Sequence, residues 1–117
     1  MQYLMLINLG PKARDYRNLS ADEQRELAAG FQALNQTPGV TPGLGLQPPA
    51  AATTVRVQDG TAVRSEGPFV DAAQALDGYF ILEAGDLDAA IDVASSVPAT
   101  KLGGAVEIRP VTDWAQS

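Results

Sequence analysis

Hydrophobic residues are concentrated in a few short runs along the chain. Residues 2–8 read QYLMLIN, an almost continuous apolar run that predicts a central strand buried on both faces. Residues 78–84, GYFILEA, form a second dense run rich in aromatic and branched side chains, which predicts another strand. Residues 105–111, AVEIRPV, alternate apolar and charged positions. They predict a last strand, which Pro110 places at an edge or an end of the sheet.

Two other stretches have the period of amphipathic helices. After a charged linker, Ser20 and Glu23 have the spacing of a capping box, and the helix that they open ends near Asn35. Asp86 caps a second helix, which Pro98 stops. The predicted apolar faces contain Leu27, Phe31 and Leu34 in the first helix and Leu87, Ala90, Ile91 and Ala94 in the second.

Turn-forming residues dominate the middle of the chain. Residues 37–50 carry many Pro and Gly and predict a loop with at most a short strand around Leu44–Leu46. Residues 53–58 and 61–65 bracket Asp59-Gly60, a dipeptide suited to a two-residue hairpin turn. The first of these runs alternates apolar and polar positions, so we expect a half-exposed hairpin.

The order of elements predicts an α+β fold. Two strand-helix-strand units with a hairpin insertion indicate a sandwich in which two helices cover one face of a mainly antiparallel sheet. At 117 residues, the chain is expected to form one domain over residues 1–117. The other face of the sheet is left without a cover. A second copy of the protein covers it most economically, so we expect a homodimer.

Composition narrows the possible chemistry. The chain has 8 Lys and Arg against 14 Asp and Glu, a net charge of -6, which disfavours nucleic acid and anionic membrane surfaces as partners. It contains no cysteine and no histidine, which removes thiolate chemistry, the usual general base and the commonest metal ligands. No apolar run reaches the roughly 18 residues of a membrane span, and no signal peptide is apparent. We expect a soluble cytoplasmic protein with no metal and no cofactor.

Several motifs along the chain resemble those of a known family. They are the YLMLI strand, GLQPPAAATTVRVQDG, EGPF, LDGYFILEAGDLDAAIDVASSVP and VEIRPV. In this order they are similar to the YCII-related family, in its DGPF-domain branch, over about residues 1–112. The resemblance implies a ferredoxin-like fold that pairs sheet to sheet as a dimeric α/β barrel. It also implies relatives that act on small cyclic or aromatic compounds with a His-Asp pair, and some that are encoded beside sigma factors.

The chain departs from that family at the residues that carry chemistry. It has no histidine, so the catalytic pair has no counterpart here. The motif reads EGPF in place of DGPF, so Gly67, Pro68 and Phe69 match whereas Glu66 is a conservative change. Ala73 stands where the branch usually has Lys. These departures favour a family signature over an active-site loop.

The remaining candidate residues each have a functional and a structural interpretation. Glu66 and Asp71 could act as general acid or base, or could hold the turn and cap the residues that follow, and the structural interpretation is favoured. Tyr3 and Tyr79 could aim their hydroxyls into one cavity as proton donors, although core tyrosines are commoner. Arg64 could orient an anionic ligand. Gly67, Pro68 and Phe69 complete the candidate ligand-binding set.

Three functions remain open at this point. The leading hypothesis is a homodimer that binds a small organic ligand without established catalysis. The second is a lyase or isomerase that acts on a small cyclic or aromatic substrate by carboxylate and tyrosine acid-base chemistry. The third is a protein-interaction module in a sigma-factor-linked regulatory pathway.

Overall fold

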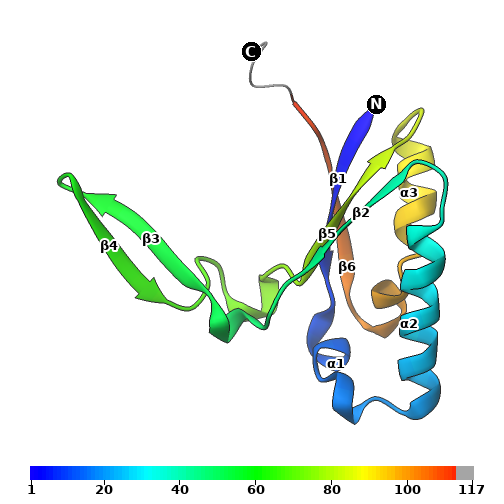
Figure 1. Ribbon diagram of the computed structural model, residues 1–117, viewed down its shortest axis with the longest axis horizontal. Helices are drawn as coiled ribbons and strands as arrows, with labels where there is room; N and C mark the ends of the chain where they lie inside the picture. Colours follow the sequence, from blue (N-terminus) through cyan, green and yellow to red (C-terminus); the bar gives the residue numbers. More distant parts are fainter. Residues whose placement is uncertain (113–117) are drawn as a thin grey trace.

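The computed structural model describes residues 1–112 and shows two sheets of different character (Figure 1). The larger sheet is antiparallel, with the strand order β2-β5-β1-β6, and the smaller consists of β3 and β4 alone. The strand bounds are β1 Gln2–Asn8, β2 Val40–Gly45, β3 Thr53–Gln58, β4 Thr61–Glu66, β5 Gly78–Glu83 and β6 Ala105–Pro110. The predicted strands are confirmed. The short strand expected around Leu44–Leu46 is β2, which is longer than expected and begins at Val40.

Three helices and four short 3-10 turns connect the strands. They are α1 Gly10–Arg14, α2 Ala21–Asn35, α3 Leu87–Ser95, η1 Tyr16–Asn18, η2 Pro49–Ala51, η3 Ala72–Gln74 and η4 Pro98–Leu102. The capping box at Ser20 and Glu23 is present, and Asp86 accepts a hydrogen bond from the Ala89 amide, so both predicted helix starts are confirmed. Short helix α1 lies where the sequence indicated only a linker. No helix in residues 1–112 is both long and apolar enough to cross a membrane.

Without the hairpin, the order of elements is ferredoxin-like. Strand β1 lies between β5 and β6, with Leu4 opposite Ile81 and Arg109. Helices α2 and α3 both lie over one face of this sheet (Figure 1). The prediction of an α+β sandwich with two helices on one face is therefore confirmed. Pro110 is the last residue of β6, an edge strand, also as predicted.

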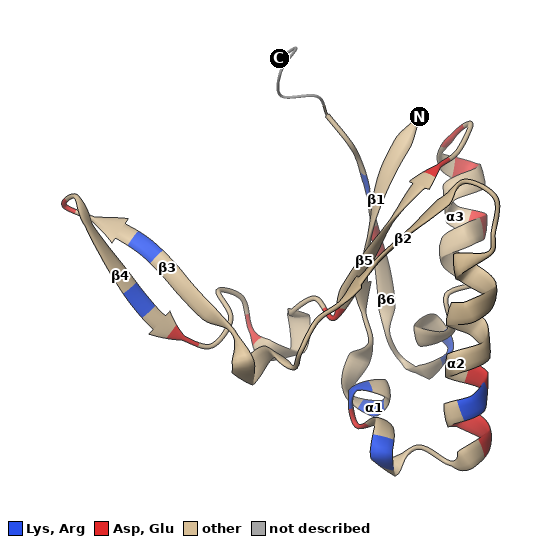
Figure 2. Ribbon diagram, in the orientation of Figure 1, with Lys and Arg blue, Asp and Glu red and all other residues tan. Residues whose placement is uncertain are grey.

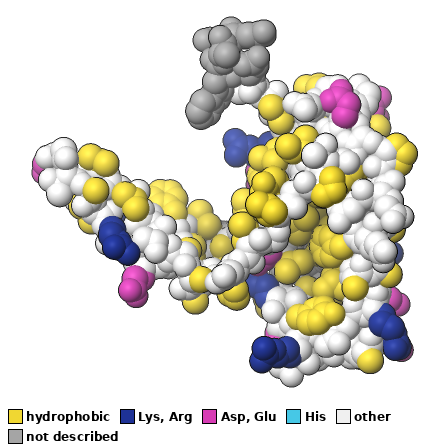
Figure 3. Space-filling model, in the orientation of Figure 1, with side chains coloured by type: hydrophobic (Ala, Val, Ile, Leu, Met, Phe, Trp, Pro, Cys, Tyr) yellow, Lys and Arg dark blue, Asp and Glu magenta, His cyan; other side chains and the backbone are white. Residues whose placement is uncertain are grey.

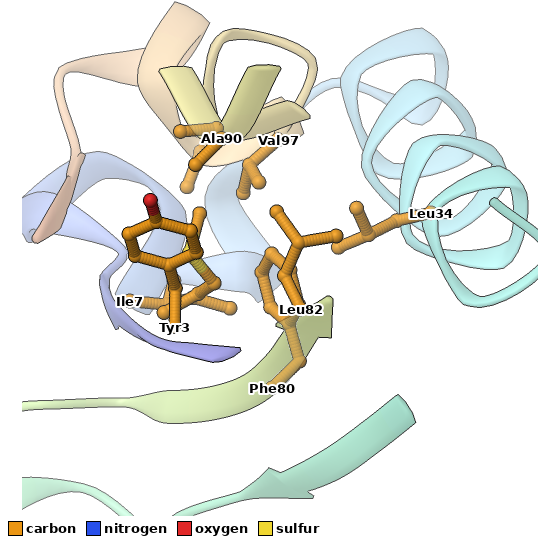
Figure 4. Packing of buried hydrophobic residues seen from close by; sticks show 10 residues of the cluster. Tyr3, Ile7, Leu34, Phe80, Leu82, Ala90 and Val97 are labelled. Atoms are coloured by element: carbon orange, nitrogen blue, oxygen red, sulfur yellow. The ribbon is translucent and has the colours of Figure 1, made fainter. Parts of the chain in front are cut away.

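The main core lies between the sheet and the helices (Figure 4). Alternate residues of β1 and β5 point to this side, among them Tyr3, Met5, Phe80 and Leu82, each at most 2% exposed. From α3, Ala90 and Ala94 are buried, as predicted, because small side chains let the helix approach the sheet. Leu87 and Ile91 were expected on the same face but are exposed. Val93 and Val97 pack on the core instead.

No helix within residues 1–112 lies over the opposite face of the sheet. Its centre is formed by Leu4 and Leu6 of β1 with Tyr79 and Ile81 of β5, all half-buried. The register places Glu83, at the end of β5, and Glu107 and Arg109 of the edge strand β6 on this face. Strand β1 carries no charged residue (Figure 2). This apolar centre is called the open sheet face below.

Strands β3 and β4 form an arm, residues 53–66, that projects away from the body (Figure 1). The turn is built as predicted, with Asp59 at φ 51° and Gly60 at φ 79°, the left-handed conformations that a two-residue hairpin turn requires. The arm differs from the expected half-exposed hairpin, because nearly every residue on both of its faces is exposed. Its length gives the chain a radius of gyration of 16.2 Å, against about 13 Å for a compact domain of about 100 residues.

Candidate functional site

A cleft of about 290 Å³ lies between α2 and the part of the sheet where β2 meets β5. Figure 3 shows hydrophobic side chains in the hollow between the sheet and α2. The lining is mainly apolar, with Asn35 and Asp77 as its polar side chains, and consists of Ile7, Leu9, Phe31, Leu34, Asn35, Gly43, Leu44, Gly45, Asp77, Gly78, Tyr79 and Phe80. A small, mainly apolar cleft with a few polar groups has the character of a ligand site.

Glycines let the backbone close around the cleft. The register of β2 on β5 shifts between Pro42 and Gly45. A Cβ at Gly43 would lie 2.0 Å from the carbonyl oxygen of Tyr79, so a larger residue at this position would push β2 away from β5. A Cβ at Gly45 would meet nothing within 4 Å. The narrow spacing at Gly43 therefore sets one wall of the cleft.

Asp77 forms the polar end of the cleft and is only 8% exposed. Its carboxylate accepts hydrogen bonds from the Arg14 guanidinium at 2.8 and 3.0 Å and from the Leu9 amide at 2.8 Å. Both oxygens therefore have partners inside the protein, as a buried carboxylate requires. Asp77 is therefore a fixed hydrogen-bond acceptor in the cleft wall, and Arg14 balances its charge.

The same arginine fixes the segment between the arm and β5, residues 71–77, which is called the strap below. Arg14 donates to the carbonyl oxygens of Ala72, at 2.8 Å, and Ala75, at 2.6 Å. Asn8 donates to the carbonyl oxygens of Ala73, at 3.0 Å, and Ala75, at 3.2 Å. These side chains of β1 and α1 therefore hold the strap against the body and set the direction in which the arm leaves it.

The candidate carboxylates of the EGPF loop lie outside the cleft. Glu66 and Asp71 are both exposed. Asp71 stands at the N-cap of η3 but accepts no capping hydrogen bond through its side chain, so the cap expected there is not formed. Within residues 1–112, neither carboxylate has a hydrogen bond or ion pair that would prepare it as an acid or a base.

The Gly-Pro-Phe core of the loop has a structural role at the root of the arm. Gly67 adopts φ 94°, its amide donates to the Ala52 carbonyl at 2.8 Å, and its own carbonyl accepts from the Thr54 hydroxyl at 2.8 Å. Phe69 is 71% exposed, and the Arg56 guanidinium lies 5.1 Å from the centre of its ring, within cation–π range. Pro68 and Phe69 line an open apolar groove of about 410 Å³ at this root.

The two arginines of the arm lie on opposite faces of it. Arg56 is paired with Val63, whereas Arg64 is paired with Val55. Residues in directly opposed positions share a face. The two cations therefore do not form one anion site within the arm. Arg64 stays a candidate for binding an anionic ligand only because its side chain is exposed.

The two candidate tyrosines point to opposite faces of the sheet. Tyr3 is buried in the core among residues that contact the helices, and its hydroxyl lies 3.4 Å from the Met1 sulfur. Tyr79 is half-buried, neighbours Leu6 on the open sheet face and also lines the cleft. The two hydroxyls therefore do not share one cavity, because alternate residues of a strand point to opposite sides, and Tyr3 has the core position that was the favoured interpretation.

Glu23, a residue outside the cleft, has a pKa below its ordinary value. The pKa of Glu23 is lowered by its hydrogen bond to Lys12, by the Ser20 amide and by the Lys12 charge, but this glutamate lies at the start of α2, away from the cleft. Across the described part of the chain, no group of three or more acidic side chains is placed to hold a metal ion.

Sequence reasoning overlooked the pair that shapes the cleft, Arg14 and Asp77. They lie 63 residues apart, and although Asp77 belongs to the LDGYF motif, nothing in the sequence links it to Arg14. A weak signal existed, since Asp77 is a charged residue immediately before a densely apolar strand, where an acid needs a partner if it is buried.

Comparison with known proteins relates the chain to a family and to a bacterial protein. The sequence profile of the YCII-related domain matches residues 1–115. An uncharacterized protein of Rhizobium meliloti (strain 1021) is 30% identical to this chain over 99 residues, which is 84% of this chain and 73% of that protein. The profile match includes the cleft, the strap and the arm, so the similarity concerns the whole fold and not one motif.

Proposed function

Because the chain belongs to the YCII-related domain family, we propose that it is a single-domain member of the DGPF branch, that it acts as a homodimer and that it binds a small organic compound. The observation that carries the ligand proposal is the cleft between α2 and the β2–β5 edge. Its volume of about 290 Å³ lies at the lower end of the range for ligand pockets, so the compound is small.

The lining defines the chemical class of the ligand. Phe31 of α2 offers an aromatic surface, and Asn35, one turn further along the same helix, offers an amide that can both donate and accept. The Asp77 carboxylate is already neutralised by Arg14. A neutral, flat compound with one polar edge therefore fits the cleft better than a strongly charged one.

Binding without catalysis is the form of this proposal that the site supports. Glu66 and Asp71 are exposed and lie outside the cleft, and both Asp77 oxygens are engaged by Arg14 and the Leu9 amide. The lack of cysteine fits a reducing compartment such as the cytoplasm, where we propose that the protein works.

To test the ligand proposal, indole is titrated into the full chain as a probe, and binding is followed by NMR. We expect saturable shifts of amide signals from residues that line the cleft. Phe31→Ala should weaken indole binding about tenfold, because an aromatic contact contributes about 0.5–1.5 kcal/mol beyond burial of area.

Phe69→Ala is the matched control, since it removes an exposed aromatic ring outside the cleft. It should leave indole affinity unchanged. A loss of affinity in Phe69→Ala but not in Phe31→Ala would place the ligand at the EGPF loop and contradict the cleft proposal. Absence of saturable shifts in the unaltered protein would contradict it as well.

A further inference from the structure

The arm has the surface of a buried element, although nothing within residues 1–112 covers it. Of the thirteen large hydrophobic side chains that are exposed in residues 1–112, eight lie in residues 44–76, the arm and its two connections. They are Leu44, Leu46, Val55, Val57, Val63, Phe69, Val70 and Leu76. Exposed apolar side chains that gather in one region mark an interaction surface, whereas scattered ones do not.

One face of the arm carries an exposed apolar group near the tip, formed by Val55, Val57 and Ala62. Opposed pairs place six residues on this face, called the valine face below: Thr53, Val55, Val57, Ala62, Arg64 and Glu66. Val55 is 61% exposed and Val57 is 71% exposed. In the described part of the chain, strands β3 and β4 pair only with each other, and an isolated two-stranded hairpin is at best marginally stable in water. The arm therefore needs a surface to lie on.

The arm is held in a fixed direction and does not hang from a loose linker. One of its connections is held by the Leu46 amide, which donates to the Asp77 carbonyl at 2.8 Å. The other is the strap, held by Arg14 and Asn8. A projecting element with two anchored connections is prepared to meet a partner in one orientation, which lowers the entropy lost on docking.

The arm and the open sheet face form the two sides of one angle, and residues 1–112 leave the space between them empty. Figure 1 shows the arm leaving the sheet on the side opposite the helices. Figure 3 shows hydrophobic side chains along the side of the arm that faces this angle and on the adjoining strands. Any molecule that covers the open sheet face from this side therefore also meets the arm.

We infer that the arm of each protomer lies on the body of a second copy, so that two chains exchange arms across the sheet-to-sheet interface. This inference rests on the proposed homodimer and adds a second contact surface to it. A second copy fits because it also has an arm and an open sheet face. In a dimer with a twofold axis, each arm then lies on the body of the other chain. The two outer edges of the hairpin are also protected in this way from unspecific strand pairing.

The valine face also carries two charged residues. Arg64 is paired with Val55 and Glu66 with Thr53, so both lie nearer the base of the arm than Val57. Arg64 and Glu66, two residues singled out from the sequence, thus become interface residues contributed to the partner.

The test uses the absence of cysteine, because one introduced thiol is then the only one in the chain. Val57→Cys places it on the valine face, and Gln58→Cys places it on the opposite face, one residue away. Both full-length variants are labelled with N-ethylmaleimide over a range of protein concentrations, and sedimentation of the same samples gives the fraction of dimer. We expect the Val57→Cys thiol to react at least about tenfold more slowly as the dimer forms, while the Gln58→Cys thiol stays reactive.

The outcomes separate this inference from the homodimer itself. Fast labelling of both thiols in samples that are dimeric overturns the arm exchange and leaves the homodimer standing. Samples that stay monomeric overturn both. Protection of the Val57→Cys thiol that is equal in monomeric and dimeric samples means that the arm folds onto its own chain, and this also overturns the exchange.

A second measurement identifies the molecule that covers the arm. A photoreactive benzoylphenylalanine replaces Val57 in isotope-labelled protein, which is mixed with unlabelled protein before irradiation. Cross-linked peptides should join one labelled and one unlabelled chain. Cross-links confined to a single isotope composition would contradict the exchange.

Discussion

At the scale of single residues, Arg14 and Asp77 tie together three parts of the chain. The pair links α1 to the start of β5, and through the Ala72 and Ala75 carbonyls Arg14 also holds the strap. The Asp77 side chain is 5% exposed and that of Arg14 is 19% exposed. Removal of one partner from such a pair leaves a buried charge without compensation, which costs far more than the intact pair contributes.

We therefore predict that Arg14→Ala strongly destabilises the protein. The free energy of unfolding, measured by urea titration, should fall by about 3–5 kcal/mol, because Asp77 and two strap carbonyls lose their donors. Arg17→Ala, an exposed arginine three residues later, is the control and should change it by less than about 0.5 kcal/mol. Equal urea midpoints for the two variants would contradict the role of Arg14.

At the scale of elements, α2 approaches η4 through Gly30. A Cβ added at Gly30 would lie 2.2 Å from the Pro98 Cγ atom, which belongs to a rigid ring. In an exposed helix, Gly→Ala usually stabilises by about 1 kcal/mol. The close approach to Pro98 should reverse that sign, because added volume in a packed contact forces the elements apart.

Gly30→Ala should accordingly lower the free energy of unfolding by about 1–3 kcal/mol, as measured by thermal or urea denaturation. The same substitution in a Pro98→Ala background should be neutral or stabilising, since the ring that it meets is gone. Destabilisation of equal size in both backgrounds would show that the contact with Pro98 is not the cause.

At the scale of the whole molecule, the sheet has one face covered by helices and one face open. The centre of the open sheet face is apolar, with Leu6 between Tyr79 on β5 and Glu107 on β6. A charge in this centre is tolerated when the face meets water but opposes the contact of two such faces, because an unpaired charge would be buried. Substitution at Leu6 therefore separates folding from assembly.

We predict that Leu6→Glu yields a folded monomer at micromolar concentrations at which the unaltered chain sediments as a dimer. Ile91→Glu, which places the same charge on an exposed apolar position of α3, should leave the dimer intact. Far-UV circular dichroism verifies that both variants are folded. An unaltered chain that sediments as a monomer would contradict the proposed homodimer directly.

Most element boundaries were readable from the sequence because each has a local cause. The helix from Ala21 to Asn35 begins at a capping box, and the hairpin turns at Asp59-Gly60 because glycine tolerates positive φ. The apolar face of α3 was misjudged at Leu87 and Ile91. A nine-residue helix offers few turns from which to choose a face, and its small alanines, not its larger side chains, decide the approach to the sheet.

The sequence by itself determined the order of elements, the covered and open faces of the sheet and the membership of the chain in its family, because these depend on periodicity and on motifs read along the chain. Only the tertiary structure decided the site. The cleft joins β1, α2, β2 and β5, and its polar end depends on Arg14 meeting a residue 63 positions away. Residues so far apart leave no periodic pattern in the sequence, so their contact is seen only in the folded chain. The EGPF loop, which the sequence makes most visible, lies outside that cleft at the root of the arm.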